Sequence, residues 1–219
     1  MKTRYHHVLQ ALCIANAVSI SLFLMRVLGT HSTRYSFLIW NLILAWVPLG
    51  LVIWLKKRLK VSRWLSPSNI ALTIAWLVFL PNSFYLVSDL IHLHATGEVN
   101  ILFDAVLFAS FIFDGFISGL ISLYLMHKEL IKRLGEQRSH QIIGLVILIS
   151  SFAIYLGRNL RWNSWDLIAS PLGLIFDVSE PLLNPVAHPQ AFLTTLTFFM
   201  LIGSMYAVAW QLILAIKHE

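Results

Sequence analysis

Long apolar segments separated by short polar connections recur along the whole chain. Six of them are 20 residues or longer, and they cover residues 8–29, 35–55, 69–91, 101–126, 141–161 and 191–216. A helix needs about 20 apolar residues to cross roughly 30 Å of hydrocarbon, so each segment is long enough to span a membrane. The pattern predicts an all-α, polytopic membrane helix bundle of about six transmembrane helices, forming a single domain over residues 1–219.

The one long connection, residues 162–190, separates the fifth and sixth segments. It contains four prolines, which prevent one continuous helix. Its apolar stretch, residues 171–176, is too short to cross a bilayer. We expect this Pro-rich segment to lie along the outer membrane interface or to dip into the bundle.

Composition and charge agree with a membrane protein. Hydrophobic residues make up 58% of the chain and charged residues 12%, about half the charge of an average soluble domain. The content of aromatic residues excludes a disordered chain. The net charge of +6 alone would suggest a nucleic-acid partner, but the position of the basic residues argues against one.

The basic residues are unevenly distributed between the two sides of the predicted bundle. Twelve of the 16 lie in the segments 1–7, 56–68, 127–140 and 217–219, and four, Arg26, Arg34, Arg158 and Arg161, lie on the other side. Cytoplasmic loops of membrane proteins carry the excess of Lys and Arg. The distribution predicts that both termini are cytoplasmic, in a multi-pass protein of the bacterial cytoplasmic membrane.

The third segment carries a polar stripe that follows a proline. Asn82, Tyr85, Asp89 and His92 have helical spacings of three, four and three, which place them within an arc of about 80°. Asn82 and Tyr85 would serve equally as hydrogen-bonding contacts between helices. Asp89 is an ionisable residue within the predicted span, near its outer end, so it either takes part in chemistry or forms a salt bridge with Arg26 or Arg158.

The fifth segment ends in the string YLGRNLRWNSWDL, which carries two arginines against the expected charge distribution. If the helix continues through this string, Arg158, Asn159, Trp162 and Asp166 share one face. Arg158 and Arg161 would then hold a phosphate or carboxylate, or alternatively pair with acidic residues of other helices.

The second and fourth segments add further polar residues. Asn41 lies in the outer third of the second segment, and Asp104 opens the fourth. Asp114 is the most deeply placed charge of the chain, so it is either hydrogen-bonded, paired, or part of an ion path. Gly115 and Gly119 next to it form a small-residue face suited to close helix packing.

These strings together resemble a bacterial membrane protein family catalogued as domain of unknown function 1361. The resemblance rests on WNLILAWVPL, FLPNSFYLVSDLIHL, Asp104 and SSFAIYLGRNLRWNSWD, and covers about residues 36 to 190. Asp114 departs from the uncharged residue expected there. The family has no established activity, so the resemblance implies membrane class and transfers no mechanism.

The polar residues predict one outward-facing pocket for an anionic or amphiphilic ligand, such as a lipid headgroup, at the outer leaflet. The arginines would hold the anion, Asp89 or His92 would act as acid or base, and no cofactor is expected. A metal bound by Asp89, His92 and Asp104 is disfavoured because the helical spacing supplies only one clear ligand pair. The predicted pocket residues are Asn41, Asn82, Tyr85, Asp89, His92, Asp104, Arg158, Asn159, Arg161, Trp162 and Asp166.

Two other functions fit the same sequence. A transporter or ion-coupled carrier would use the proline break at Pro81 together with Asp114, and a non-catalytic scaffold would use the same polar residues as internal salt bridges. The sequence leaves open whether the protein is an enzyme, and it leaves its oligomeric state open.

Overall fold

The computed structural model describes residues 2–218, with side chains described for residues 7–181 and 183–216. The helices in this part of the chain are α1 (Lys2–Thr30), α2 (Phe37–Arg58), α3 (Pro67–Tyr85), the 3-10 helix η1 (Leu86–His92), α4 (Ile101–Leu134), α5 (Glu136–Asn159), α6 (Asp166–Ala169), α7 (Pro171–Leu183) and α8 (Pro189–His218). Six helical spans in the described residues are long and apolar enough to cross a membrane. The predicted all-α, multi-pass membrane bundle is confirmed.

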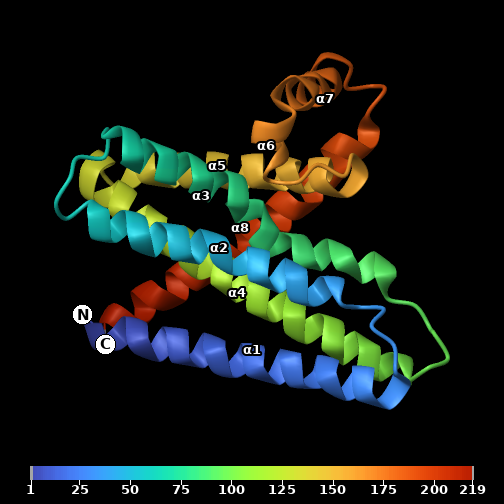
Figure 1. Ribbon diagram of the computed structural model, residues 1–219. Helices are drawn as coiled ribbons and strands as arrows, with labels where there is room; N and C mark the ends of the chain where they lie inside the picture. The colour runs from blue at the N-terminus through green and yellow to red at the C-terminus, as the bar shows by residue number, and fades with distance from the viewer. Residues whose placement is uncertain (1, 219) are drawn as a thin grey trace.

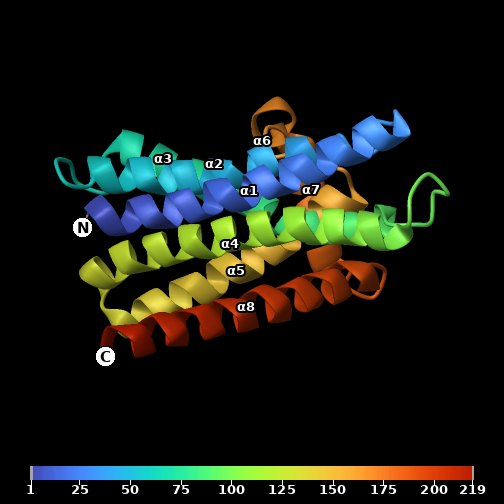
Figure 2. The same ribbon diagram turned by 90° about the horizontal axis from the view of Figure 1, so that it is seen from below.

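The long helices lie side by side, with α4 at the centre (Figures 1 and 2). α4 packs against α1, α2, α3, α5 and α8. Both chain termini lie at one end of the bundle, as an even number of spans requires, and we call the opposite end the far end. The α6–α7 segment stands off the side of the bundle (Figure 1). The orientation in the membrane stays a prediction, and the predicted inner side chains of Lys2, Arg4 and Lys217 lie outside the described residues.

The small-residue face of α4 allows α3 to approach closely. A Cβ atom added at Gly115 would lie 2.5 Å from Leu86 Cδ1, and one added at Gly119 would lie 2.7 Å from Phe84 Cζ and 2.8 Å from Ser83 Cβ. The ends of the Leu86 and Phe84 side chains can move, but the Ser83 carbonyl, 2.9 Å from a Cβ at Gly115, and Ser83 Cβ can move away only if α3 shifts. The two glycines therefore determine how closely α3 packs against α4, and at which level along α4 it lies. α3 is the helix in which the polar stripe begins.

Two of the expected helices end differently from the prediction. The third span changes from α-helix to 3-10 helix after Tyr85. The fifth ends at Asn159, close to the predicted end at residue 161, so the condition under which its polar face would reach Asp166 is not met. The chain leaves α5 through Arg161 in a left-handed conformation (φ 62°), a common way for a helix to end. The N–H of Trp162 then donates to the Leu156 carbonyl at 3.2 Å.

Candidate functional site

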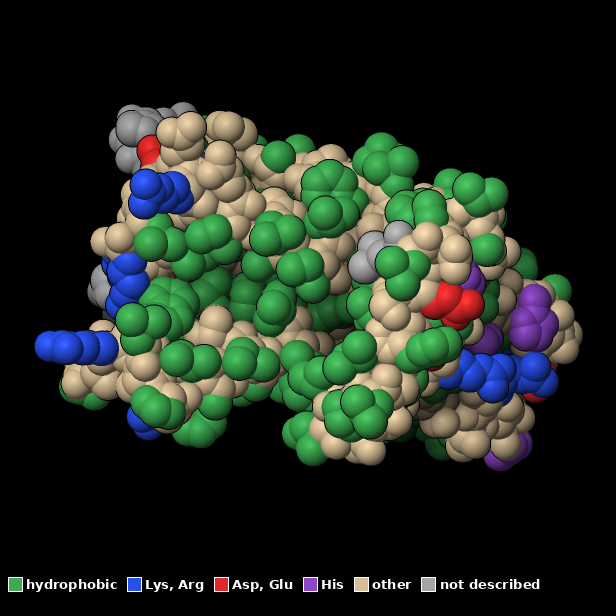
Figure 3. All heavy atoms as spheres, turned by 90° about the horizontal axis from the view of Figure 1, so that it is seen from above, with side chains coloured by type: hydrophobic (Ala, Val, Ile, Leu, Met, Phe, Trp, Pro, Cys, Tyr) green, Lys and Arg blue, Asp and Glu red, His purple; other side chains and the backbone are tan. Residues whose placement is uncertain are grey.

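A cavity of about 450 Å³ lies among α2, α3 with η1, α5 and the α6–α7 segment. The view from this side shows a hollow lined by hydrophobic side chains, with Arg, His and acidic residues gathered toward one end (Figure 3). Seven of the eleven predicted residues line the cavity: Asn41, Asn82, Tyr85, Asp89, His92, Arg158 and Trp162. Cavities of this size are typical of small-molecule sites.

Asp89 is the centre of the polar contacts at the far end of the cavity. Its side chain is buried, although it lies at the end of a membrane span. Asn41 Nδ2 donates to Asp89 Oδ2 at 2.7 Å, and Arg158 Nη1 lies 3.7 Å from Asp89 Oδ1. Three elements, α2, η1 and α5, thus converge on one carboxylate.

Arg158 also contacts His92, with Nη2 3.1 Å from His92 Nε2. A guanidinium has only donors, so His92 Nε2 accepts this hydrogen bond. The ring proton of His92 is therefore on Nδ1, and the imidazole is neutral in this arrangement. The polar stripe survives the change to a 3-10 helix, because three residues per turn place Asp89 and His92 one above the other.

The loop after α5 forms another wall of the cavity through contacts with α3. Asn82 Nδ2 donates to the Phe79 carbonyl and to Ser164 Oγ, both at 2.9 Å. Ser164 Oγ in turn donates to the Val78 carbonyl at 3.2 Å. These bonds surround Pro81, which has no N–H to contribute to the helix. The proline thus marks the place where a loop docks on the spanning helix.

α7 is tied to the same wall by one tryptophan. Trp162 Nε1 donates to Asp177 Oδ2 at 2.8 Å. The Trp162 ring also lies where a Cβ atom at Gly173 would be 3.2 Å away, so α7 packs closely on it. Trp162 therefore lines the cavity and at the same time holds α7 against it.

Four predicted residues do not line the cavity. Arg161 is exposed, and Asn159 donates from Nδ2 to Gln190 Oε1 at 3.3 Å. Asp166 opens α6 and accepts a hydrogen bond from the Asn163 N–H at 2.7 Å. Arg161 and Asp166 lie elsewhere because α5 ends before them, whereas Asn159 is the last residue of α5 and bonds to α8. Asp104, the fourth, is held by a different helix.

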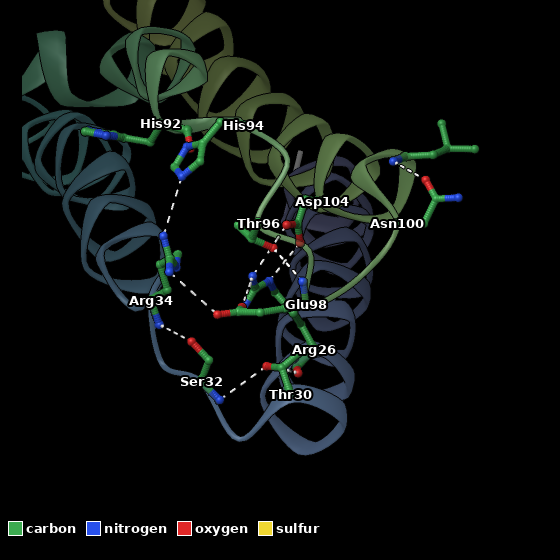
Figure 4. A network of polar contacts seen from close by, with 11 residues as sticks. Arg26, Thr30, Ser32, Arg34, His92, His94, Thr96, Glu98, Asn100 and Asp104 are labelled. Carbon is green, nitrogen blue, oxygen red and sulfur yellow. Dashed lines mark hydrogen bonds and ion pairs between the residues drawn. The ribbon is translucent and has the colours of Figure 1, made fainter.

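Asp104 belongs to a buried ion-pair network between α1 and the start of α4 (Figure 4). Arg26 Nε donates to Asp104 Oδ1 at 2.7 Å, and Arg26 Nη2 donates to Glu98 at 2.8 Å. The guanidinium also lies 4.3 Å from the centre of the Tyr35 ring. Burial, with a contribution from the Asp104 carboxylate, raises the pKa of Tyr35 above its ordinary value. The network extends to Arg34, 3.6 Å from Glu98.

Asp114 is buried and bound by a neighbouring hydroxyl. Ser19 Oγ donates to Asp114 Oδ2 at 2.6 Å, which joins α1 to α4. Asp114 does not line the cavity. Within the described side chains, no group of three or more His, Cys, Asp or Glu residues is arranged to hold a metal ion. The deepest charge and the candidate site are therefore separate features.

Trp40 and Ser164 are two of the lining residues that the sequence analysis did not assign to the pocket. Trp40 precedes Asn41 and lines the cavity with more than half of its side chain exposed. An aromatic residue beside a polar one at the end of a span was the available signal. Ser164 gave no comparable signal, because its role depends on the loop conformation after α5.

Comparison with known families gives a match that covers most of the chain. The model of the family described as "Protein of unknown function (DUF1361)" matches residues 40–205, a range that includes every residue lining the cavity except Phe37. No curated protein and no solved structure matches the chain significantly. The protein is thus a member of the DUF1361 family.

Proposed function

We propose that the cavity binds an amphiphile, with its polar head at the far end and its alkyl chain along the apolar wall. The observation that carries this proposal is the distribution of lining residues along the helices. Asp89, His92 and Arg158 line the far end, whereas Leu77 and Ile149 line the cavity deeper in the bundle. Ile149 precedes Arg158 by nine residues on α5, a rise of roughly 13 Å.

The apolar wall supports entry from the membrane. Trp40, Ile149 and Leu167 line the cavity and remain between 41% and 53% exposed. In a bilayer, such side chains face lipid. An alkyl chain would therefore pass into the cavity without crossing a polar surface.

As part of the same proposal, the head of the ligand lies in the outer leaflet of a bacterial cytoplasmic membrane, which the charge asymmetry of the sequence supports. Within it, Asp89 and His92 orient Arg158 and the head. Both already contact that arginine, and this geometry favours binding over proton transfer. Their role as acid and base stays a prediction.

The two alternative functions have weaker support in the geometry. A scaffold would use the Asp89–Arg158 contact, but it gives no reason for a cavity beside that contact. A transporter path through Asp114 would have to leave the cavity, because Asp114 is bound to Ser19 on another side of α4. Both alternatives predict that cavity variants retain the same lipids as the wild type.

The test is mass spectrometry of lipids retained by protein extracted with its surrounding bilayer into polymer nanodiscs. Arg158→Ala removes a lining side chain, and Arg161→Ala removes the same side chain type three residues away, outside the cavity. Ala153→Phe fills the apolar wall without changing charge. We expect one class of amphiphile to be depleted in Arg158→Ala and Ala153→Phe and kept in Arg161→Ala. An identical lipid complement in all four proteins would refute the proposal.

A further inference from the structure

The charged side chains that line the cavity balance each other. Among the side chains that the structure describes, Asp89 and Arg158 are the only Asp, Glu, Lys or Arg residues of the lining, and they carry one negative and one positive charge. His92 is neutral while it accepts from Arg158. Arg161, the second arginine expected to hold an anion, is exposed and outside the lining. The site therefore has no excess positive charge.

An anionic head would meet the Asp89 carboxylate. A phosphate or carboxylate on Arg158 would lie within a few ångströms of Asp89, which is itself only 3.7 Å from that guanidinium. Like charges at such distances repel strongly where water is excluded. The buried Asp89 cannot move its charge into water to relieve this repulsion.

The remaining lining groups are neutral and suit hydroxyls. Asn41 and Asn82 use their Nδ2 atoms for protein hydrogen bonds, and their Oδ1 atoms accept none from the described residues. The Tyr85 side chain adds a phenol, which both donates and accepts. Trp40 and Trp165 line the cavity with 53% and 44% of their surface exposed, which leaves ring surface for the C–H face of a sugar.

We infer that the head of the ligand is an uncharged polyhydroxylated group, a sugar or polyol, carried on an alkyl chain. This inference rests on the proposed function and specifies the class of amphiphile. A hydroxyl group both donates and accepts hydrogen bonds. It can therefore donate to the amide oxygens or to Asp89 and accept from Arg158, and it adds no charge to a site whose charges already balance.

The test uses two photoreactive probes with the same diazirine-bearing alkyl chain, one an alkyl glucoside and the other an alkyl phosphate monoester. The full-length protein is placed in phosphatidylcholine nanodiscs, and crosslinks are mapped to peptides of the apolar wall around Leu44 and Ile149. We expect the glucoside probe to label these peptides roughly tenfold more strongly than the phosphate probe at equal concentration. Equal or stronger labelling by the phosphate probe overturns the inference but leaves amphiphile binding intact. Absence of labelling by both probes overturns the proposed function as well.

A charge variant tests the reason for this preference. Asp89→Asn keeps the size of the side chain and can still accept from Asn41, but it removes the negative charge that balances Arg158. The ratio of glucoside to phosphate labelling should fall by roughly tenfold or more. Asn41→Ala should lower labelling by the glucoside probe, and Asn159→Ala, an asparagine outside the lining, should not. A ratio unchanged by Asp89→Asn would refute the charge-balance argument.

Discussion

Replacement of Arg26 by methionine removes the only cation that contacts Asp104 within the described residues. Both side chains are 1% exposed, and they share bonds of 2.7 Å from Nε and 3.4 Å from Nη2. Methionine keeps much of the apolar stem of the arginine, so the change isolates the charge. The variant leaves a buried carboxylate without its counter-charge at the start of α4.

The expected loss is about 3–5 kcal/mol in the free energy of unfolding, the range for breaking a buried ion pair from one side. Glu98 loses its bond to Arg26 as well, but it is 29% exposed and keeps access to water. Its share is therefore about 0–1 kcal/mol. The cost should come mainly from Asp104.

A double-mutant cycle separates this cost from ordinary packing changes. Replacing both partners, Arg26→Met with Asp104→Leu, removes the unpaired charge, so this protein should be within about 1–2 kcal/mol of the wild type. The assay is reversible unfolding by SDS in mixed micelles, followed by tryptophan fluorescence and far-UV circular dichroism. Glu98→Gln is the control, with an expected loss below about 1 kcal/mol. The reasoning would be refuted if the free energy of unfolding of Arg26→Met lay within about 1 kcal/mol of the wild type. It would also be refuted if the loss in the double variant equalled the sum of the losses in Arg26→Met and Asp104→Leu.

The same unfolding assay tests two further contacts of α4. Gly119→Ala should destabilise the bundle by about 1–3 kcal/mol, because its new methyl group meets α3. Gly144→Ala meets nothing within 4 Å and should be neutral or stabilising by about 0.5–1 kcal/mol, so equal losses in the two would contradict the close packing. Ser19→Ala removes the hydrogen bond to buried Asp114 and should cost about 1–3 kcal/mol. Ser21→Ala, on the exposed side of α1, should change stability by less than about 0.5 kcal/mol, and matching effects of the two serine variants would argue against the Asp114 contact.

The fold was predictable because the hydrocarbon core of a bilayer offers no hydrogen-bond partners to the backbone. A span must satisfy its own N–H and C=O groups, so long apolar segments become helices whatever their packing. The polar stripe of the third span was predictable for a related reason. Spacings of three and four residues place its residues on one face of an α-helix, and a spacing of three does so in a 3-10 helix. The change of helix type after Tyr85 therefore left them on a common face.

The residues beyond Asn159 were not predictable by the same periodicity, because periodicity holds only while the helix continues. α5 ends at Asn159, and the left-handed conformation of Arg161 turns the chain away. Nothing in the string RWNSWD marks that turn, since glycine or asparagine would be the usual residue there. Asp166 was therefore assigned to a helix face that does not extend so far, and Arg161 to a pocket that it does not line.

The choice of ion-pair partners depends on which helices are neighbours, and this choice sets the charge of the cavity. From the sequence, Arg26 and Arg158 were both partners for Asp89. Because α1 packs on α4, Arg26 pairs with Asp104 and is withdrawn from the cavity. Of the described side chains, Arg158 is then the one cation paired with Asp89, and the two charges cancel. A site that the sequence suggested for an anion thereby becomes better suited to a neutral head, through a pairing made between two other helices.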